Sequence, residues 1–207
     1  MKIRSLAIAL ALSIAARLEA QAAAPAAPAP LDPAKLRVAA SGRVKTEVTL
    51  AMPRTPDQPA TTPVKISVDY GQPHARGREI VGGLVPFDSV WRTGANSSTT
   101  FTTDVDLTIG GTFVPKGSYS LYTLPTRAGW KLIVNRQTGQ WGTTYDAARD
   151  LARIDLASRT LTEPRESFSI TIVPAVDAPG ATQPPAHGQL VLSWGTTELS
   201  TDWKVGR

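Results

Sequence analysis

Cysteine is absent from the 207 residues of this chain. Its absence excludes disulfide frameworks, thiolate zinc and iron–sulfur sites, cysteine nucleophiles and a lipid-anchored amino-terminal cysteine. Histidine is almost absent too: only His74 and His187 occur, and neither belongs to a His-x-His or His-Glu-x-x-His pattern. No calcium-loop pattern of spaced acids is present either. We therefore expect neither a metal site nor a cofactor.

Glycine-rich nucleotide loops and serine hydrolase motifs are missing as well. The chain has no Gly-x-Gly-x-x-Gly string, no Walker loop and no Gly-x-Ser-x-Gly elbow. These absences remove dinucleotide binding, P-loop phosphoryl chemistry and the α/β-hydrolase mechanism from consideration. The residues favour a non-catalytic protein, although they do not decide the question.

Long apolar runs occur only at the start of the chain. Lys2 and Arg4 precede an apolar stretch over residues 6–16, which only Ser13 interrupts, and small residues follow around Ala20. This order is typical of a secretory signal peptide, and the stretch is too short for a membrane-spanning helix. We interpret residues 1–20 as a signal peptide rather than a buried helix, and expect a periplasmic or secreted protein.

A strong charge of either sign is also lacking. The net charge of +5 falls to +3 when residues 1–20 are removed, because they contain three basic residues and one acidic residue. No block of lysine or arginine remains after residue 20. A nucleic-acid partner is therefore not expected.

Proline marks the irregular parts of the chain. Twelve of the 17 prolines fall in three stretches, within residues 25–33, 53–63 and 174–185. The first predicts an extended Ala/Pro-rich tether over residues 21–33, and the other two predict surface loops. The remainder, residues 34–207, has the length of one domain.

Alternation of apolar and polar residues dominates that domain. Val64, Ile66, Val68 and Tyr70, for example, share one face of a predicted strand. Gly110-Gly111 predicts a tight hairpin, and only Tyr145 to Leu151 has a helical pattern. The pattern indicates an all-β, antiparallel β-sandwich, of jelly-roll or Ig-like type, with one short helix and about eleven short strands. We expect these strands within residues 36–38, 44–52, 64–70, 101–109, 112–114, 118–124, 130–134, 154–156, 168–172, 190–194 and 199–205.

Residues 71–97 follow neither the strand nor the helix period. An aperiodic segment of this length in a small domain is usually an ordered, functional loop. Its arginines offer planar donors for carboxylate, phosphate or sulfate groups, and its tryptophan offers a flat face for a sugar. The candidate ligand-binding residues are Arg76, Arg78, Trp91, Arg92 and Asn96, together with Trp141, which is predicted to lie at the same end of the body.

Two other interpretations of this segment stay open. Its arginines could pair with Glu79 and Asp88 and brace the loop internally, with Trp91 as a hydrophobic plug. Glu79 and Asp88 are also the only candidates for the paired carboxylates of a glycoside hydrolase, the interpretation that the sequence supports least.

Five strings in this order resemble one known family. They begin at Arg76, Val90, Gly117, Trp130 and Gln140, and read RGRxIxGGLVP, VWRTGAN, GxYxLYTxP, WxLIxN and QWG. The chain is similar, over residues 36–205, to the bacterial family called domain of unknown function 2911. The resemblance implies an exported, mostly β protein, and it brings no activity, cofactor or catalytic residue.

The sequence as a whole favours an exported domain that binds an anionic or sugar-like ligand of the cell envelope through these arginine, tryptophan and asparagine residues. The alternative is a structural or protein-interaction module in which the same loop is an internal brace. No transmembrane segment is expected in either case.

Overall fold

The computed structural model describes residues 30–53, 56–176 and 184–207. The predicted signal peptide and residues 21–29 of the predicted tether lie outside this range. The chain divides into two units, residues 1–37 and 38–207. The described part of the first contains one 3₁₀ turn, η1 (Pro33–Lys35), in which the Ala34 N–H donates to the Asp32 carboxylate. Within the described ranges, no helix has the length and apolar character needed to cross a membrane.

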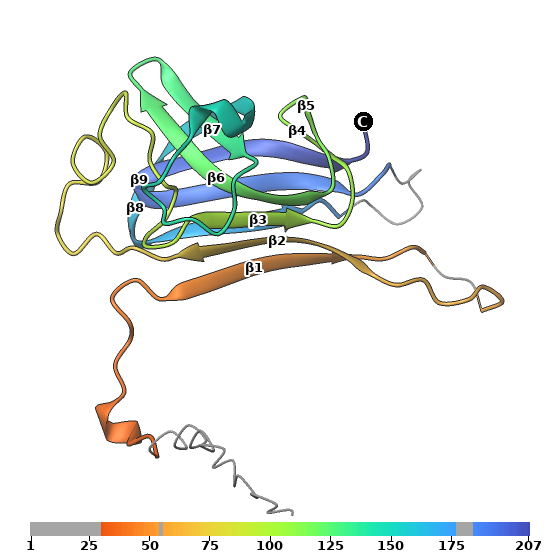
Figure 1. Ribbon diagram of the computed structural model, residues 1–207, viewed down its shortest axis with the longest axis horizontal. Helices are drawn as coiled ribbons and strands as arrows, with labels where there is room; N and C mark the ends of the chain where they lie inside the picture. The colour runs from red at the N-terminus through yellow and green to blue at the C-terminus, as the bar shows by residue number, and fades with distance from the viewer. Residues whose placement is uncertain (1–29, 54–55, 177–183) are drawn as a thin grey trace, which may run out of the picture. The chain divides into compact units, whose positions relative to one another are not determined.

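The second unit is all-β and antiparallel, as predicted (Figure 1). The nine strands of its described residues follow the order β1-β2-β3-β6-β7-β8-β9-β4-β5 across the sheet. They are β1 (Arg43–Leu50), β2 (Val64–Gly71), β3 (Thr99–Thr103), β4 (Leu107–Ile109), β5 (Thr112–Val114), β6 (Gly117–Thr126), β7 (Gly129–Asn135), β8 (Asp150–Pro174) and β9 (His187–Val205). The proline-rich segment between β1 and β2 contains no strand in its described part, as expected.

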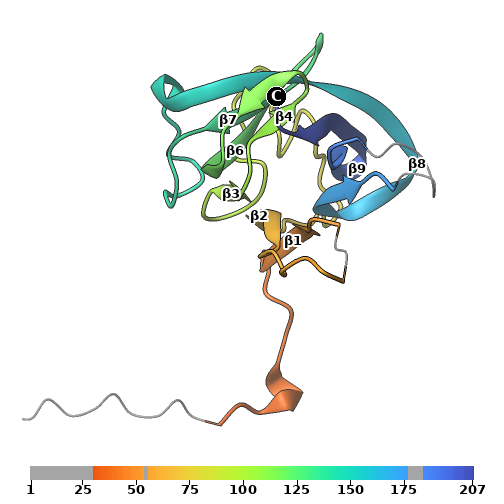
Figure 2. The same ribbon diagram turned by 90° about the vertical axis from the view of Figure 1, so that its right-hand side faces the viewer.

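The long strand β8 connects the two parts of this sheet. Its first residues pair with β7, and from Ala157 onward it pairs with β9, with two register shifts on the way. Figure 2 shows β8 curving around the body in a wide arc. Its far half returns to the β2 end, where Ser167 forms an antiparallel bridge with His74. The curled sheet thereby encloses one hydrophobic core.

Alternation determines which side chains enter that core. In β2, Ile66, Val68 and Tyr70 are buried, while Lys65 is exposed on the opposite face. The predicted hairpin at Gly110-Gly111 is confirmed: both glycines have positive φ, 50° and 77°, and they join β4 to β5. Two consecutive left-handed residues match the twist of the flanking strands, and glycine adopts them without steric cost.

One predicted strand is wrong because two acidic side chains interrupt it. The alternation over residues 101–109 is continuous, yet β3 ends at Thr103 and β4 begins at Leu107 in the other part of the sheet. Asp104 accepts the N–H of Lys65, and Asp106 accepts the N–H of Lys116. These hydrogen bonds hold the corner at which the chain changes partners.

Other predicted boundaries also change. The strands predicted at 154–156 and 168–172 are parts of β8, and those at 190–194 and 199–205 are parts of β9. The predicted strand at 36–38 is not formed, because no neighbour pairs with it and Val38 is 91% exposed. The predicted helix is reduced to the 3₁₀ turn η2 (Ala147–Arg149), since β8 already begins at Asp150.

Substitution of Gly71 tests how closely the irregular segment, residues 71–97, packs on the strands. A Cβ at this position would overlap the carbonyl of Ala95, whereas a Cβ at Gly42 would meet only Ala39, at 3.6 Å. We expect Gly71→Ala to cost about 1–3 kcal/mol of unfolding free energy, because backbone rather than a flexible side chain must move. That corresponds to a fall in Tm of roughly 3–10 °C in thermal denaturation. Gly42→Ala is the matched control, and equal Tm values for the two variants would contradict the packing.

Candidate ligand-binding site

The segment between β2 and β3 is an ordered loop that its backbone attaches to three different parts of the body. Pro73 accepts the N–H of Phe168 in β8, and Trp91 exchanges two hydrogen bonds with Thr123 in β6, at 2.8 and 2.9 Å. Near its end, the loop's Asn96 carbonyl accepts the N–H of Gly142. These bonds satisfy main-chain groups that strands would otherwise pair. The loop therefore gives its side chains defined positions.

Trp91 is placed by the structure in an aromatic cluster. Its ring stacks on Trp194 with centroids 5.7 Å apart, and it meets the edge of Phe168 at 5.1 Å. Both partners belong to the buried core. The indole thus packs as a plug over the sheet, one of the two roles that the sequence left open for it.

Arg78 uses its side chain to close its own turn. Its Nε donates to the carbonyl of Ala75 at 3.0 Å, and one terminal nitrogen donates to the carbonyl of His74 at 2.9 Å. Arg76 contributes its backbone N–H to the carboxylate of Glu166, while its own side chain is exposed. The turn is therefore held by arginine–carbonyl contacts.

Arginine–carboxylate pairs do not brace this loop. Within the described residues, none of the ion pairs joins Arg76, Arg78 or Arg92 to Glu79 or Asp88. The predicted internal ion-pair network is therefore not observed, because backbone hydrogen bonds and aromatic packing hold the segment instead.

The two candidate acids lie in different settings. Glu79 lines a cleft of about 430 Å³ together with Arg78, Arg165 and Glu166. Asp88 is not among the residues that line this cleft; its backbone has a φ of 58°, and its N–H donates to the carbonyl of Pro125. The cleft thus contains one of the two carboxylates that a glycoside hydrolase needs from this pair.

Arg92, Asn96 and Trp141 come together at a second place, which we call the Trp141 corner and define as these three residues with Gln140 and Gly142. Gly142 donates its N–H to Asn96, and a Cβ on Gly142 would lie 2.6 Å from Cδ of Arg92. The aliphatic part of Arg92 therefore lies directly on this glycine. Two of the sequence strings, VWRTGAN and QWG, meet here although 44 positions separate Asn96 from Gln140.

The Trp141 corner presents unused recognition groups. Trp141 is 55% exposed, one of the largest apolar surfaces of an ordered loop. Arg92 spends Nε on the carbonyl of Gly94, and its terminal nitrogens make no hydrogen bond to any described residue. Asn96 has a φ of 63° and donates Nδ2 to the carbonyl of Ser41, which leaves its Oδ1 free of described donors.

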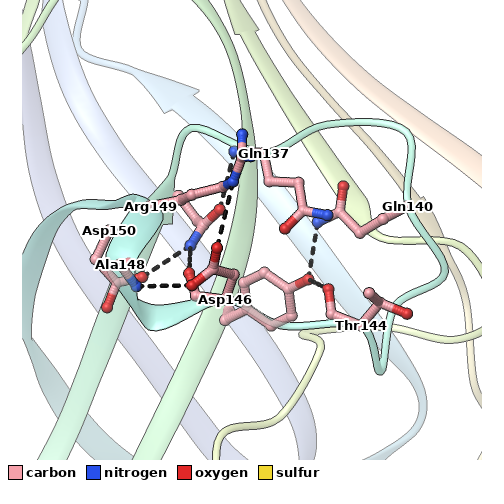
Figure 3. Close-up of polar contacts among 9 residues, drawn as sticks. Gln137, Gln140, Thr144, Asp146, Ala148, Arg149 and Asp150 are labelled. Atoms are coloured by element: carbon pink, nitrogen blue, oxygen red, sulfur yellow. Dashed lines mark hydrogen bonds and ion pairs between the residues drawn. The ribbon is translucent and has the colours of Figure 1, made fainter.

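A buried polar layer supports the corner (Figure 3). Nε2 of Gln140 donates to Oγ of Ser120 at 3.0 Å and to the hydroxyl of Tyr122 at 2.9 Å, and Tyr122 in turn donates to the carbonyl of Thr144. Oε1 of Gln140 and Oγ of Ser98 are buried without a partner among the described residues. Buried polar groups are usually paired, so these two atoms are exceptions within the layer beneath the corner.

The loop that carries Trp141 is stiffened by a second network around Asp150. This carboxylate accepts hydrogen bonds from Tyr145 at 2.7 Å, from Arg153 at 2.9 Å and from Asn135 at 2.9 Å. Desolvation, followed by the hydrogen bond and charge of Asp150, raises the pKa of Tyr145 to about 12. Tyr145 therefore stays protonated at neutral pH and acts as a structural donor. Figure 3 shows Asp150 beside the turn that Asp146 caps.

Sequence reasoning missed the buried residues beneath the corner. Ser98, Ser120 and Tyr122 stand at inward positions of strands or beside one, where a period-two pattern predicts simple core packing. The one signal that marked Gln140 was its place in the QWG string. In the described ranges, no cluster of three histidine or acidic side chains could hold a metal ion.

The fold and the site define an antiparallel all-β protein with an ordered, arginine-containing loop and an exposed tryptophan. The chain matches the family described as protein of unknown function (DUF2911) over residues 54–202. It belongs to that family, which confirms the resemblance of the sequence strings. Comparisons with curated proteins and with solved structures found no significant match.

Substitutions of Arg78 and Arg76 test whether the Arg78 side chain stabilises the loop or is only an exposed charge. Arg78→Ala removes two side-chain hydrogen bonds to loop carbonyls, so we expect a loss of about 1 kcal/mol and a fall in Tm of roughly 2–4 °C. Arg76→Ala is the matched control, because the Arg76 side chain has no hydrogen bond to a described residue. Thermal denaturation that shows the same change for both variants would refute the brace.

Tyr145 makes stability depend on pH at the alkaline end. Its pKa is raised from 10.0 to about 12 in the folded state, so its contribution is complete below pH 10 and is lost as the pH rises toward 12. We expect the difference in unfolding free energy between the natural chain and Tyr145→Phe to shrink over this interval. Urea denaturation at a series of pH values measures it, and a constant difference would show that the hydroxyl is not coupled to Asp150.

Proposed function

We propose that this protein is an exported, non-catalytic binding domain that takes an anionic, sugar-like ligand at the Trp141 corner. Export rests on the amino-terminal pattern of Lys2, Arg4 and the apolar residues that follow. Binding rests on the site, and the observation that carries it is the exposed Trp141 side chain on an ordered backbone segment that Arg92 and Asn96 contact at Gly142.

The backbone that carries the exposed indole is held in place. Ser97 and Trp141 form a backbone bridge, and hydrogen bonds on both sides of it, from Ser98 to Gln140 and from Gly142 to Asn96, fix the strand-like contact. Exposing a large aromatic face costs hydrophobic free energy, which a ligand recovers by covering it. A loop whose backbone is already ordered also lowers the entropic cost of binding, because the ligand does not have to order it.

The polar groups around the platform indicate the chemistry of the ligand. A sugar ring offers C–H groups for the indole face and hydroxyls for an asparagine amide, while a carboxylate or sulfate on it suits the terminal nitrogens of Arg92. The ordinary arrangement of such sites is an apolar surface with a few oriented polar groups. None of the five residues that define the corner is acidic or a histidine, so they supply no acid–base pair.

A second candidate is a structural module without a ligand. The observation that favours it is the attachment of the loop to β6 and β8 through its backbone, which would stabilise the sheet by itself. In that case the exposed Trp141 has no partner of its own, and its removal changes neither stability nor binding.

Trp141→Ala distinguishes the two candidates. We expect a galacturonate oligosaccharide to raise the Tm of the natural chain in a thermal-shift assay, through its affinity for the native state. Trp141→Ala should lose most of this affinity, about tenfold or more, while its Tm without ligand stays within about 1 °C, because surface truncations cost little. Phe87→Ala, which shortens another exposed aromatic residue, 36% exposed, is the control and should retain the shift.

The charge of the ligand is tested in the same assay. A neutral oligosaccharide of equal length should shift the Tm less than the galacturonate, and Arg92→Gln should remove that difference. Failure of both oligosaccharides to shift the natural chain would reject the proposal and leave the structural module.

A further inference from the structure

A second cavity, of about 1160 Å³, lies where β9 meets the β4–β5 hairpin. Its lining includes Phe113 of β5, Trp203 and Lys204 of β9, and Arg207. None of these residues belongs to the loop or to the Trp141 corner. The volume exceeds that of a typical small-ligand site, which spans roughly 300–1000 Å³.

The walls of this cavity are largely apolar. Phe113 forms one side, and Pro184, Pro185 and the glycines of the hairpin contribute further surface. The absence of a side chain at Gly188 brings Trp203 close to the backbone, because a Cβ there would lie 3.0 Å from the indole ring. An apolar chain or ring system is therefore the body that these walls would cover.

One buried donor in the lining has no partner. Trp203 is 3% exposed, and its Nε1–H makes no hydrogen bond to any described residue. A buried indole N–H normally finds an acceptor, and leaving it unpaired costs about 1–3 kcal/mol. This nitrogen is itself sealed from solvent, so a molecule in the cavity meets the ring edge near Gly188 and not the N–H.

The charges at the rim are mainly positive. Lys204 and Arg207 are exposed, and the Arg207 guanidinium lies over the Phe113 ring, 4.4 Å from its centroid. Among the described lining residues Asp202 is the one acid, and its carboxylate already accepts a hydrogen bond from Gln189 at 3.1 Å. The imidazole of His187 contacts the carbonyl of Pro185. An anionic head group complements this rim.

We propose that this cavity binds a single-chain anionic amphiphile, with its apolar chain against Phe113 and Trp203 and its acidic head at Lys204 and Arg207. Two features carry the proposal: the apolar walls of the cavity and the positive charge of Lys204 and Arg207 at its rim. It does not depend on the sugar-like ligand proposed for the Trp141 corner, and each can fail without the other.

Isothermal titration calorimetry with dodecanoate, below its critical micelle concentration, tests the proposal on the whole chain. We expect dodecanoate to bind at least tenfold more tightly than dodecyltrimethylammonium, which has the same chain and the opposite charge. The double variant Lys204→Glu/Arg207→Glu should weaken dodecanoate by at least tenfold. Arg127→Glu is the matched control, because Arg127 lies over Phe87 in the same kind of contact, away from the cavity.

The place of binding is read from the Trp203 indole signal in a ¹H–¹⁵N correlation spectrum, assigned with Trp203→Phe. We expect the Trp203 signal to shift on addition of dodecanoate, whereas the Trp141 indole signal should keep its position. No binding, equal affinity for the cationic amphiphile, or an unchanged affinity in the double variant would overturn the proposal. If the protein does not bind dodecanoate but sediments with phosphatidylglycerol vesicles, the rim binds a membrane surface instead. That result would also overturn the proposal.

Discussion

The structure depends on one requirement: the irregular segment between β2 and β3 has to find hydrogen-bond partners for its backbone outside any regular strand. It finds them in β8 through Pro73, in β6 through Trp91 and in the 140–142 segment through Asn96. Since buried main-chain groups are rarely left unpaired, these bonds decide where the segment lies. Its side chains, and with them the candidate site, take their positions from this attachment.

The attachment also divides the arginines of the loop into two groups with different surroundings. Arg78 faces the cleft that it shares with Glu79 and Arg165, and it spends two donors on its own turn. Arg92 lies on Gly142, beside an exposed tryptophan, and keeps its terminal nitrogens free of described acceptors. Two arginines that look equivalent in the sequence therefore have different roles. Arg78 holds its own turn, whereas Arg92 presents free donors at the Trp141 corner.

Much of the fold could be predicted, because a pleated strand with one buried face imposes a period of two. β2 and the Gly110-Gly111 hairpin follow that rule closely. The rule failed where side chains compete with strand pairing, at Asp104 and Asp106, and where one strand serves two partners, as β8 does. Local periodicity contains no information on which neighbour a strand will choose.

The sequence by itself determined the all-β class, the family and the set of residues from which a site could be built, because these follow from residue type and short spacing. Only the tertiary structure decided that Trp91 packs against the core while Trp141 stays at the surface, that Arg92 and Asn96 meet Gly142, and that Trp203 borders a cavity. Those outcomes depend on strand order and on the curl of β8, which bring together residues far apart in the chain.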